Sequence, residues 1–194
     1  MKTPVGHDAH IATLPSELHG PPELHGPSEF PGPSEFHEKE FRRTMGLFCT
    51  GVTVITTCDP GPVGFTCQSF ASLSLDPPLV TISAANTSRT LPRVLRSGSF
   101  SVNILSAGQE ELGLRFASSH PDRFAGVGWR PSPATGTPHL AGALAWVDAE
   151  VHSTVPGGDH TIVIGRVRAV RGEGEDPLLY FGGAFCARGE LPAR

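Results

Sequence analysis

The sequence of 194 residues predicts a mainly β domain, an antiparallel barrel with a few short helices. Glycine and proline are abundant, at 23 and 19 residues, and this composition favours short strands and tight turns over a helical bundle. Six or seven short stretches rich in β-branched residues are separated by turn residues, which is typical of a barrel. The few helical patterns do not alternate regularly with the strands, so a doubly wound parallel sheet is not expected.

A six-residue repeat precedes this domain and occurs four times over 15–38. Each copy begins with proline, continues with serine or a second proline, and then has glutamate and one apolar residue. Each unit offers a single apolar side chain and cannot bury enough surface to offset the entropy lost on ordering. Residues 1–33 are therefore expected to be a disordered tail, and residues 34–194 the folded domain. The histidines of the repeat are interpreted as part of a linker rather than as metal ligands.

The order of elements follows from the apolar pattern. A helix is expected over 36–48, because Phe41, Met45 and Phe48 fall on one helical face. Serine at 88 and glycine at 98 bound a second helix, and a third is expected over 107–117. Residues 120–140 are expected to form a long irregular loop. Strands are expected at 52–57, 64–75, 79–84, 100–105, 144–155 and 161–170.

Composition and charge exclude several classes of function. The formal net charge of −4 provides no electrostatic basis for binding nucleic acid or an anionic membrane. No run approaches the roughly 18 apolar residues of a spanning helix, and the first ten residues do not resemble a secretory signal. We therefore expect a cytoplasmic protein. Its four cysteines lack zinc-ligand spacing and are expected to be reduced.

The sequence lacks the common catalytic motifs. It contains no G-x-G-x-x-G after a strand, no phosphate loop ending in G-K-[ST] and no G-x-S-x-G elbow. If the chain is an enzyme, a bound cofactor is therefore expected to supply the chemistry.

The segment 83–90 leaves a strand and enters a helix, where backbone N–H groups lack partners. Hydroxyl groups from this segment and the guanidinium of Arg89 would complete a phosphate site. A purely structural explanation is equally good: in it Ser88 only caps the helix, and Arg89 is a solvated charge at the surface.

The segment 66–70 places polar side chains where a buried strand favours apolar ones. On one strand, Thr66, Gln68 and Phe70 would face one side and Cys67 and Ser69 the other, which would suit a flat ring with polar edges. A half-exposed strand explains the same pattern. His160 follows Gly-Gly-Asp in a tight turn that would direct it to one end of the barrel; a lone histidine is more often structural.

Taken together, these segments resemble the short-chain flavin reductases, the reductase partners of two-component flavin-dependent monooxygenases. The resemblance runs from about Phe41 to Arg188 and covers essentially the whole domain. The segments that carry it are FRRTMG (41–46) followed by TGVTV (50–54); TCQSF (66–70) followed by SLDPPLV (74–80); SRT (88–90); FSVNIL (100–105); RFAG (123–126); and GDH (158–160) followed by GRV (165–167).

The resemblance implies a split antiparallel β-barrel of the FMN-binding type, which dimerises and reduces FMN or FAD with NADH or NADPH. The reduced flavin would pass to a separate monooxygenase. The pair Cys67-Gln68 resembles the one found in the branch of this family that serves hydroxylases of phenolic and steroid-derived rings. By analogy His160 would lie beside the nicotinamide as the catalytic residue. The residues implied in cofactor binding are Thr66, Cys67, Gln68, Ser69, Phe70, Ser83, Asn86, Ser88, Arg89 and Thr90.

Two alternatives share this fold. One is a flavin-binding protein without catalysis, and the other is a split-barrel oxidase that keeps its flavin permanently. The Gly-Asp-His turn at 158–160 favours the reductase over both.

Overall fold

The computed structural model describes residues 37–173 and 176–187, and the predicted tail lies outside them. The chain divides into two units, Met1–His37 and Glu38–Arg194, and the elements below belong to the second. These elements are α1 (Glu38–Met45), β1 (Thr50–Gly51), β2 (Thr53–Cys58), β3 (Pro62–Cys67), β4 (Ala71–Leu75), β5 (Pro78–Ala85), α2 (Leu91–Ser97), β6 (Ser99–Ile104), the 3-10 helix η2 (Ala107–Gln109), α3 (Glu110–Ala117), β7 (Trp129–Pro131), β8 (Pro138–Leu140), β9 (Ala145–Gly157), β10 (His160–Gly172), β11 (Leu179–Phe181) and β12 (Ala184–Cys186).

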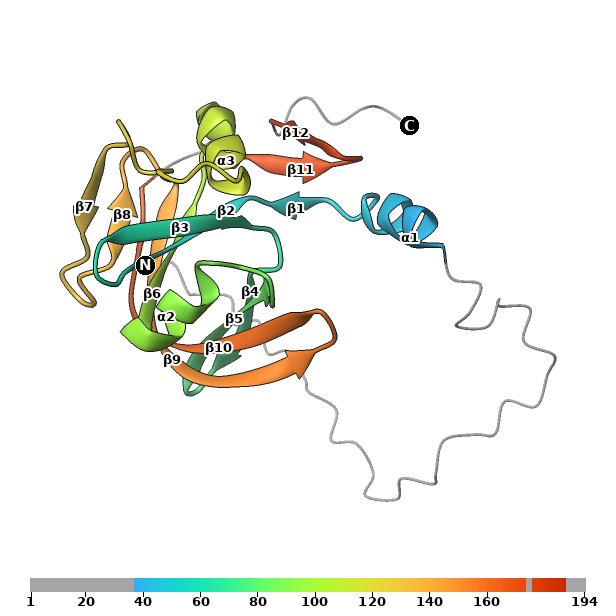
Figure 1. Cartoon of the computed structure of the whole chain (residues 1–194). Coiled ribbons are helices and arrows are strands. Elements are labelled where there is room, and N and C mark those ends of the chain that lie inside the picture. Colours follow the sequence, from blue (N-terminus) through green and yellow to red (C-terminus); the bar gives the residue numbers. More distant parts are fainter. Residues whose placement is uncertain (1–36, 174–175, 188–194) are drawn as a thin grey trace, which may run out of the picture. The chain divides into compact units, whose positions relative to one another are not determined.

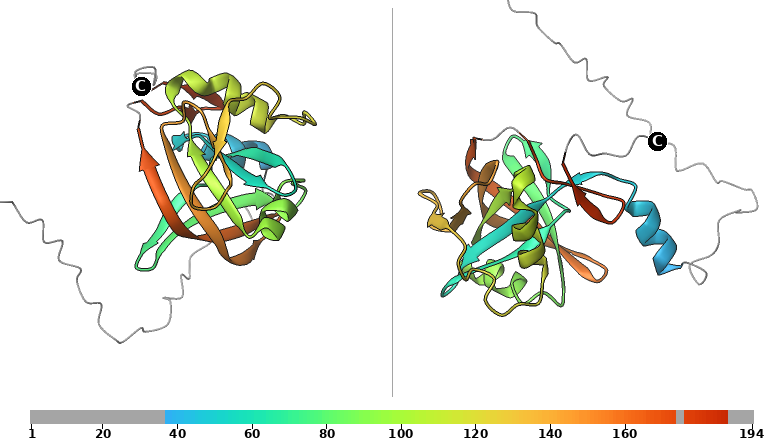
Figure 2. Two further views of the ribbon diagram at one scale, coloured as in Figure 1. Left: turned by 90° about the vertical axis from the view of Figure 1, so that its left-hand side faces the viewer. Right: turned by 90° about the horizontal axis from the view of Figure 1, so that it is seen from above.

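One antiparallel sheet of seven strands forms the body of the domain, in the order β3-β2-β6-β9-β10-β5-β4. The sheet curves round on itself (Figure 1 and Figure 2, left). Its two edge strands, β3 and β4, are consecutive in the chain and are joined by residues 68–70 alone. The link therefore spans the opening between the edges, and no ladder of hydrogen bonds closes the barrel there. The predicted mainly β split barrel is confirmed.

Apolar residues on both faces of the sheet hold it together. Successive residues of a strand point to opposite faces, and in β2 Ile55 packs with Ile82, Phe100 and Val163, whereas Val54 packs with Phe116 on the other side. At Gly165 a Cβ atom would lie 2.5 Å from Cζ of Phe100, so this position of β10 accepts no side chain.

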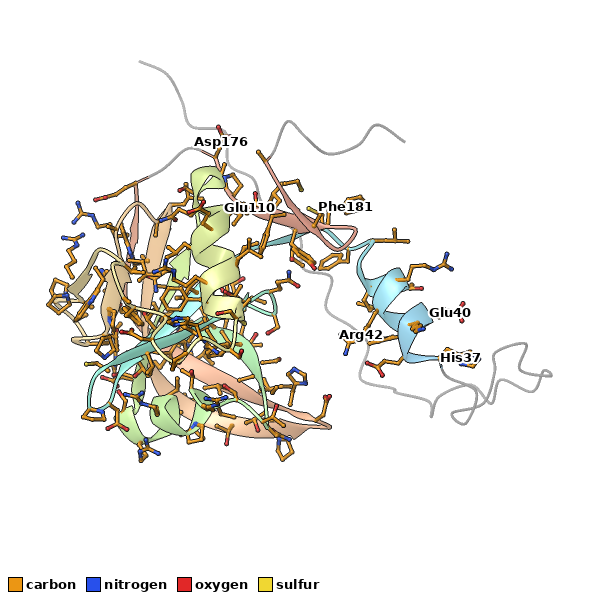
Figure 3. The ribbon with its side chains drawn as sticks, turned by 45° about the horizontal axis from the view of Figure 1, so that its top comes forward. His37, Glu40, Arg42, Glu110, Asp176 and Phe181 are labelled. Carbon is orange, nitrogen blue, oxygen red and sulfur yellow. The ribbon has the colours of Figure 1, made fainter. Side chains whose placement is uncertain are left out.

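A small sheet of β1, β11 and β12 extends the domain toward α1. Its pairing is remote in sequence: Thr50 lies opposite Tyr180, and the N–H of Gly182 donates to the carbonyl of Gly46 just after α1. Phe181 lies in this hairpin, next to α1 with its Glu40 and Arg42 (Figure 3). Helix α1 itself buries none of its residues and projects from the barrel (Figure 2, right).

The structure corrects several predicted elements. The first helix ends at Met45 rather than near Phe48. The strand expected over 64–75 is two strands, because the chain leaves one edge of the sheet after Cys67 and joins the other edge at Ala71. The loop expected over 120–140 contains the hairpin of β7 and β8, and the small sheet was not predicted.

Helix α2 ends, as predicted, at Gly98, which has a left-handed φ of 71°. The two long strands predicted near the C-terminus are β9 and β10, and each is longer than expected. Across residues 37–173 and 176–187, none of the helices has the length and apolar character needed to span a membrane.

Candidate functional site

A cavity of about 450 Å³ occupies the opening of the barrel between β3 and β5. We call it the split cavity. Residues from β3, the link after it, β5, the turn before α2 and the start of β10 line it. The predicted site residues among them are Thr66, Cys67, Gln68, Ser69, Ser83, Ser88 and His160.

Ser69 fastens the link between the edge strands to β5 and thereby fixes the shape of the cavity. Its hydroxyl donates to the carbonyl oxygen of Ser83 (3.1 Å) and accepts the N–H of Ser83 (2.8 Å). One side chain thus takes the place of a neighbouring strand at this point of β5. Because both interactions use the hydroxyl of Ser69, a ligand would contact the backbone of this residue more readily than its side chain.

Cys67 lies beneath the same link and is 4% exposed. Its sulfur is 3.2 Å from the hydroxyl oxygen of Ser69, and 3.9 Å from the carbonyl oxygen of Ser83. Burial raises the pKa of the thiol above its ordinary value of 9.0, and the hydrogen bonds with Ser69 oppose that shift only in part. The side chain is therefore a neutral thiol at neutral pH and supports the link without acting as a nucleophile.

The chain at Gln68 offers a hydrogen-bond donor to the cavity. In the described part of the chain, the N–H groups of Gln68 and Ser69 donate to no backbone carbonyl, because both strand ladders stop short of them. The N–H of Ser69 donates to the sulfur of Cys67 instead. The adjoining walls carry Phe65, Ala84 and Phe185. Polar donors along one edge of an apolar cavity suit a flat heteroaromatic ring with carbonyl and nitrogen acceptors at its rim.

Thr66 also lines the cavity, but its hydroxyl donates to the carbonyl oxygen of Gly113 in α3 (2.6 Å). This bond holds α3 against β3 and leaves only the rest of the Thr66 side chain for a ligand. The prediction that Thr66, Gln68 and Phe70 share one face of a strand is wrong, since the strand ends at Cys67. Phe70 lines a neighbouring cavity with Phe48 and Ile104 instead.

His160 is the first residue of β10 and lies opposite Ala85 at the end of β5. Its Nδ1 is 2.7 Å from a carboxylate oxygen of Asp159. An ionised carboxylate only accepts hydrogen bonds, so Nδ1 carries the proton and Nε2 of the neutral ring is an acceptor. This hydrogen bond, and next the charge of His160, lower the pKa of Asp159 below its ordinary value of 3.8.

Asn86 does not line the split cavity, although it was predicted in the site. Its amide nitrogen donates to the carbonyl of Gly158 (3.2 Å), and its amide oxygen accepts from the hydroxyl of Thr161 (2.8 Å). The backbone N–H of Asn86 donates to the carbonyl of Asp159. Asn86 thus holds the turn that carries His160 against the end of β5 and acts on the site through that turn.

The predicted phosphate residues divide between two cavities. The Ser88 hydroxyl, which lies at the split cavity, accepts the backbone N–H groups of Thr90 (3.2 Å) and Leu91 (3.3 Å) and so holds the turn before α2, whose N-cap residue is Thr90 rather than the predicted Ser88. Arg89 and the buried Thr90 line an adjoining cavity of about 170 Å³, together with Arg93 and Arg123. We call this the arginine cavity.

Several lining residues were not predicted. Phe185 comes from β12, and Ala117 from the end of α3, far from the other lining residues in sequence. No pattern in the sequence identifies such walls, because their placement depends on tertiary packing. Arg123 did stand in one of the segments that carry the family resemblance, without a role assigned to it.

Fold and cavity together define a split-barrel protein with a candidate ligand site between β3 and β5. Comparison with known proteins agrees with this class. The model of the flavin reductase like domain matches residues 45–189. The reductase subunit HsaB of a flavin-dependent monooxygenase from Rhodococcus jostii is 48% identical over 149 residues, which are 76% of this chain and 76% of that protein.

Solved structures show the same relationship. The crystal structure of nitrilotriacetate monooxygenase component B from Mycobacterium thermoresistibile matches with a TM-score of 0.75 and 45% identity, over 80% of this chain and 90% of that one. The NADH:FAD oxidoreductase SgcE6 of Streptomyces globisporus, in complex with NAD and FAD fragments, matches with a TM-score of 0.76 and 36% identity, over 82% and 96%. The chain belongs to the flavin reductase like family.

Proposed function

We propose that this protein is an NAD(P)H:flavin oxidoreductase that reduces FMN or FAD by hydride transfer. The reduced flavin would leave for a separate monooxygenase, as expected from relatives named as reductase subunits of such systems. The observation that carries the proposal is the split cavity, which gathers predicted flavin contacts from the link after β3, from β5 and from the start of β10.

The split cavity fits a flavin ring in size and in chemistry. Its volume of about 450 Å³ is in the range of small-molecule sites. The N–H group of Gln68 would donate to the polar edge of the ring, and Phe65 would contact its face. A bound flavin supplies a hydride acceptor, so no nucleophile is required of the protein.

The residues of the chain would mainly orient and stabilise. The backbone donor at Gln68 would stabilise the negative charge that arrives with a hydride. His160 stands where β10 begins, at the border of the split cavity, and would position the nicotinamide. Asp159 would hold the imidazole in one orientation through Nδ1, so that Nε2 faces the substrates.

We also propose a homodimer that works in the cytoplasm. Helix α1 buries none of its residues, and the next segment exposes Phe48, as expected for a surface that a second copy covers. Cys49, Cys58 and Cys67 form no disulfide, which fits a reducing compartment that also supplies the nicotinamide dinucleotide.

The decisive experiment follows absorbance in the NADH band, with purified protein, NADH and catalytic FMN under air. Steady loss of absorbance that depends on both protein and flavin is the expected result. Exchange of FMN for FAD and of NADH for NADPH then establishes the preferred pair. Flavin binding without NADH consumption would leave a flavin-binding protein, and a flavin that stays bound through dialysis would favour an oxidase.

A further inference from the structure

A further cavity, of about 200 Å³, lies where the hairpin of β7 and β8 meets the main sheet. We call it the hairpin cavity. Val170, which lines it, and His160, which lines the split cavity, stand near opposite ends of β10. They are about 30 Å apart along the strand, since each residue adds about 3.3 Å. The hairpin cavity is therefore separate from the split cavity, and Figure 1 shows β7 and β8 on the other side of the barrel from the turn that joins β9 to β10.

A buried histidine with one unused ring nitrogen lines the hairpin cavity. The side chain of His139 is 6% exposed, and its Nε2 lies 2.7 Å from a carboxylate oxygen of Asp148. That carboxylate also accepts the hydroxyl groups of Ser101 and Ser132, so it is ionised and Nε2 carries the proton. Nδ1 of the neutral ring is then an acceptor, and it has no hydrogen-bond partner. Because a buried acceptor without a donor is unfavourable, a ligand that donates to Nδ1 would be favoured.

The hairpin places a positive charge next to this acceptor. Arg130 of β7 lies directly opposite His139 of β8 in the ladder, and side chains of such a pair share one face. Trp146 stacks on His139 and also lies under the guanidinium of Arg130, whose carbon is 5.6 Å from the ring centre. Among the described residues Arg130 forms neither a hydrogen bond nor an ion pair, whereas Arg171, also at the cavity, pairs with Glu173.

The rest of the wall is apolar. Besides the indole of Trp146 it consists of Pro133, Ala134, Ala169 and Val170. An apolar cavity of about 150 Å³ is known to hold benzene. The hairpin cavity therefore admits one six-membered ring with small substituents, but not the three fused rings of a flavin.

We propose that the hairpin cavity is a second ligand site, which takes a small aromatic acid that also carries a hydroxyl group. The hydroxyl donates to Nδ1 of His139, the ring packs on Trp146 and the apolar wall, and the carboxylate meets the guanidinium of Arg130. This site goes beyond the proposed function, because it uses neither the flavin nor the nicotinamide.

The first experiment titrates the full chain with para-hydroxybenzoate, benzoate and phenol in a calorimeter. We expect para-hydroxybenzoate to bind most tightly. Benzoate, which lacks the donor to Nδ1, should bind about 2- to 10-fold more weakly, the usual net worth of a hydrogen bond. Phenol, which lacks the carboxylate, should lose a similar factor, because Arg130 is exposed and its charge is screened. Changing the ligand tests Nδ1 while the buried pair of His139 and Asp148 stays intact.

Substitutions then locate the two anchors. Arg130→Gln should abolish the preference for para-hydroxybenzoate over phenol and leave the preference over benzoate unchanged. Arg166→Gln is the matched control, because Arg166 is exposed on β10 outside the cavity, and it should change neither preference. Ala134→Phe places a ring at the cavity from an exposed position and should weaken all three ligands at least about tenfold.

Tryptophan emission gives an independent readout of position. The chain has two tryptophans, and of these Trp146 lines the hairpin cavity. In a Trp129→Phe protein the emission of Trp146 should change on addition of para-hydroxybenzoate, with the dissociation constant that calorimetry gives.

Equal affinities for the three ligands, or an affinity for para-hydroxybenzoate that Arg130→Gln and Ala134→Phe leave unchanged, would overturn the site. Displacement of para-hydroxybenzoate by FMN or NADH would also overturn it, because the ligand would then occupy the split cavity. A protein that binds para-hydroxybenzoate as described but never oxidises NADH would instead contradict the proposed function and leave the hairpin cavity as a ligand site.

Discussion

At the level of single residues, His160 is the side chain on which the proposed reaction depends most. Replacement by alanine removes the imidazole from the border of the split cavity. Because the backbone donor at Gln68 and the apolar walls of the cavity remain, flavin affinity should change little, whereas kcat/KM for NADH should fall by about 10- to 100-fold. Stopped-flow measurement of flavin reduction checks this. His152→Ala, on the exposed part of β9, is the control.

The pH range over which Asp159 holds that ring follows from its lowered pKa. The pKa of this carboxyl is lower in the folded protein than its ordinary value of 3.8. Its interaction with His160 is therefore fully present at pH values above 3.8 and is lost as the pH falls through the lowered pKa. The orientation of His160 by Asp159 is therefore kept across the neutral range. Full activity of His160→Ala at neutral pH would remove this residue from the site.

Cys67 allows a direct test of burial at the split cavity. Its thiol is 4% exposed and has a raised pKa, so little thiolate is available at pH 8. Cys58 is exposed. We expect alkylation of Cys67 to be at least about tenfold slower than that of Cys58, measured by mass spectrometry of timed samples. In denaturant the two rates should converge, and equal rates in the native protein would contradict the buried placement.

The segments that the sequence predicted for the site lie together at one cavity, and their binding of flavin stays a prediction. Gln68 and Ser69 were predicted in the site for their side chains, whereas the structure offers the backbone N–H of Gln68 to the cavity. Local alternation cannot reveal that a strand ends at Cys67 and that the chain crosses to another edge. Arg89 was predicted to bind a phosphate, and it lines a cavity with Arg123, which comes from a loop distant in sequence.

At the level of elements, one buried carboxylate joins the hairpin of β7 and β8 to the main sheet. Asp148 of β9 is 3% exposed. One of its oxygens lies 2.7 Å from Nε2 of His139 and accepts the hydroxyl of Ser101 (2.5 Å), and the other accepts the hydroxyl of Ser132 (2.6 Å). His139 also stacks on Trp146, with ring centroids 5.5 Å apart.

Asp148→Ala should therefore be strongly destabilising. It leaves three buried donors without an acceptor, and loss of one member of such a buried pair costs about 3–5 kcal/mol of the free energy of unfolding. Urea titration followed by circular dichroism measures the change. Glu150→Ala, on the same strand but exposed and paired with Arg168, should cost under about 0.5 kcal/mol. A small effect of Asp148→Ala would mean that the hairpin contributes little to stability.

The elements that the sequence predicted are those with a local pattern. Strands β2, β9 and β10 are rich in β-branched residues, and α2 ends at a glycine with positive φ. The hairpin of β7 and β8 escaped prediction because Pro131, Pro133 and Pro138 in and around it argue against strands. The pairing of Thr50 with Tyr180 joins segments far apart in the chain, and no window of the sequence contains both.

At the level of the whole molecule, the segment around α1 exposes apolar side chains that a second copy would cover in the proposed homodimer. Met45, Leu47 and Phe48 are 52%, 57% and 70% exposed, and no residue of α1 is buried. Adjacent apolar side chains of this kind on a soluble domain mark an interface. In a two-fold dimer the same patch appears twice, so each substitution acts twice on the association.

If the proposed homodimer forms through this patch, Met45→Glu combined with Phe48→Glu should convert it to a monomer. Each buried side chain of this type contributes about 1.5–3 kcal/mol, and loss of two per subunit weakens association by well over about 100-fold. Light scattering after size exclusion should give twice the 20.5 kDa of one chain for the wild type and a single chain mass for the variant. Leu95→Glu places the same charge on α2, where the leucine is 41% exposed, and should remain dimeric.

A wild-type protein that is monomeric at micromolar concentration would contradict the proposed assembly. A variant that is monomeric but reduces flavin at the full rate would show that each barrel carries a complete site.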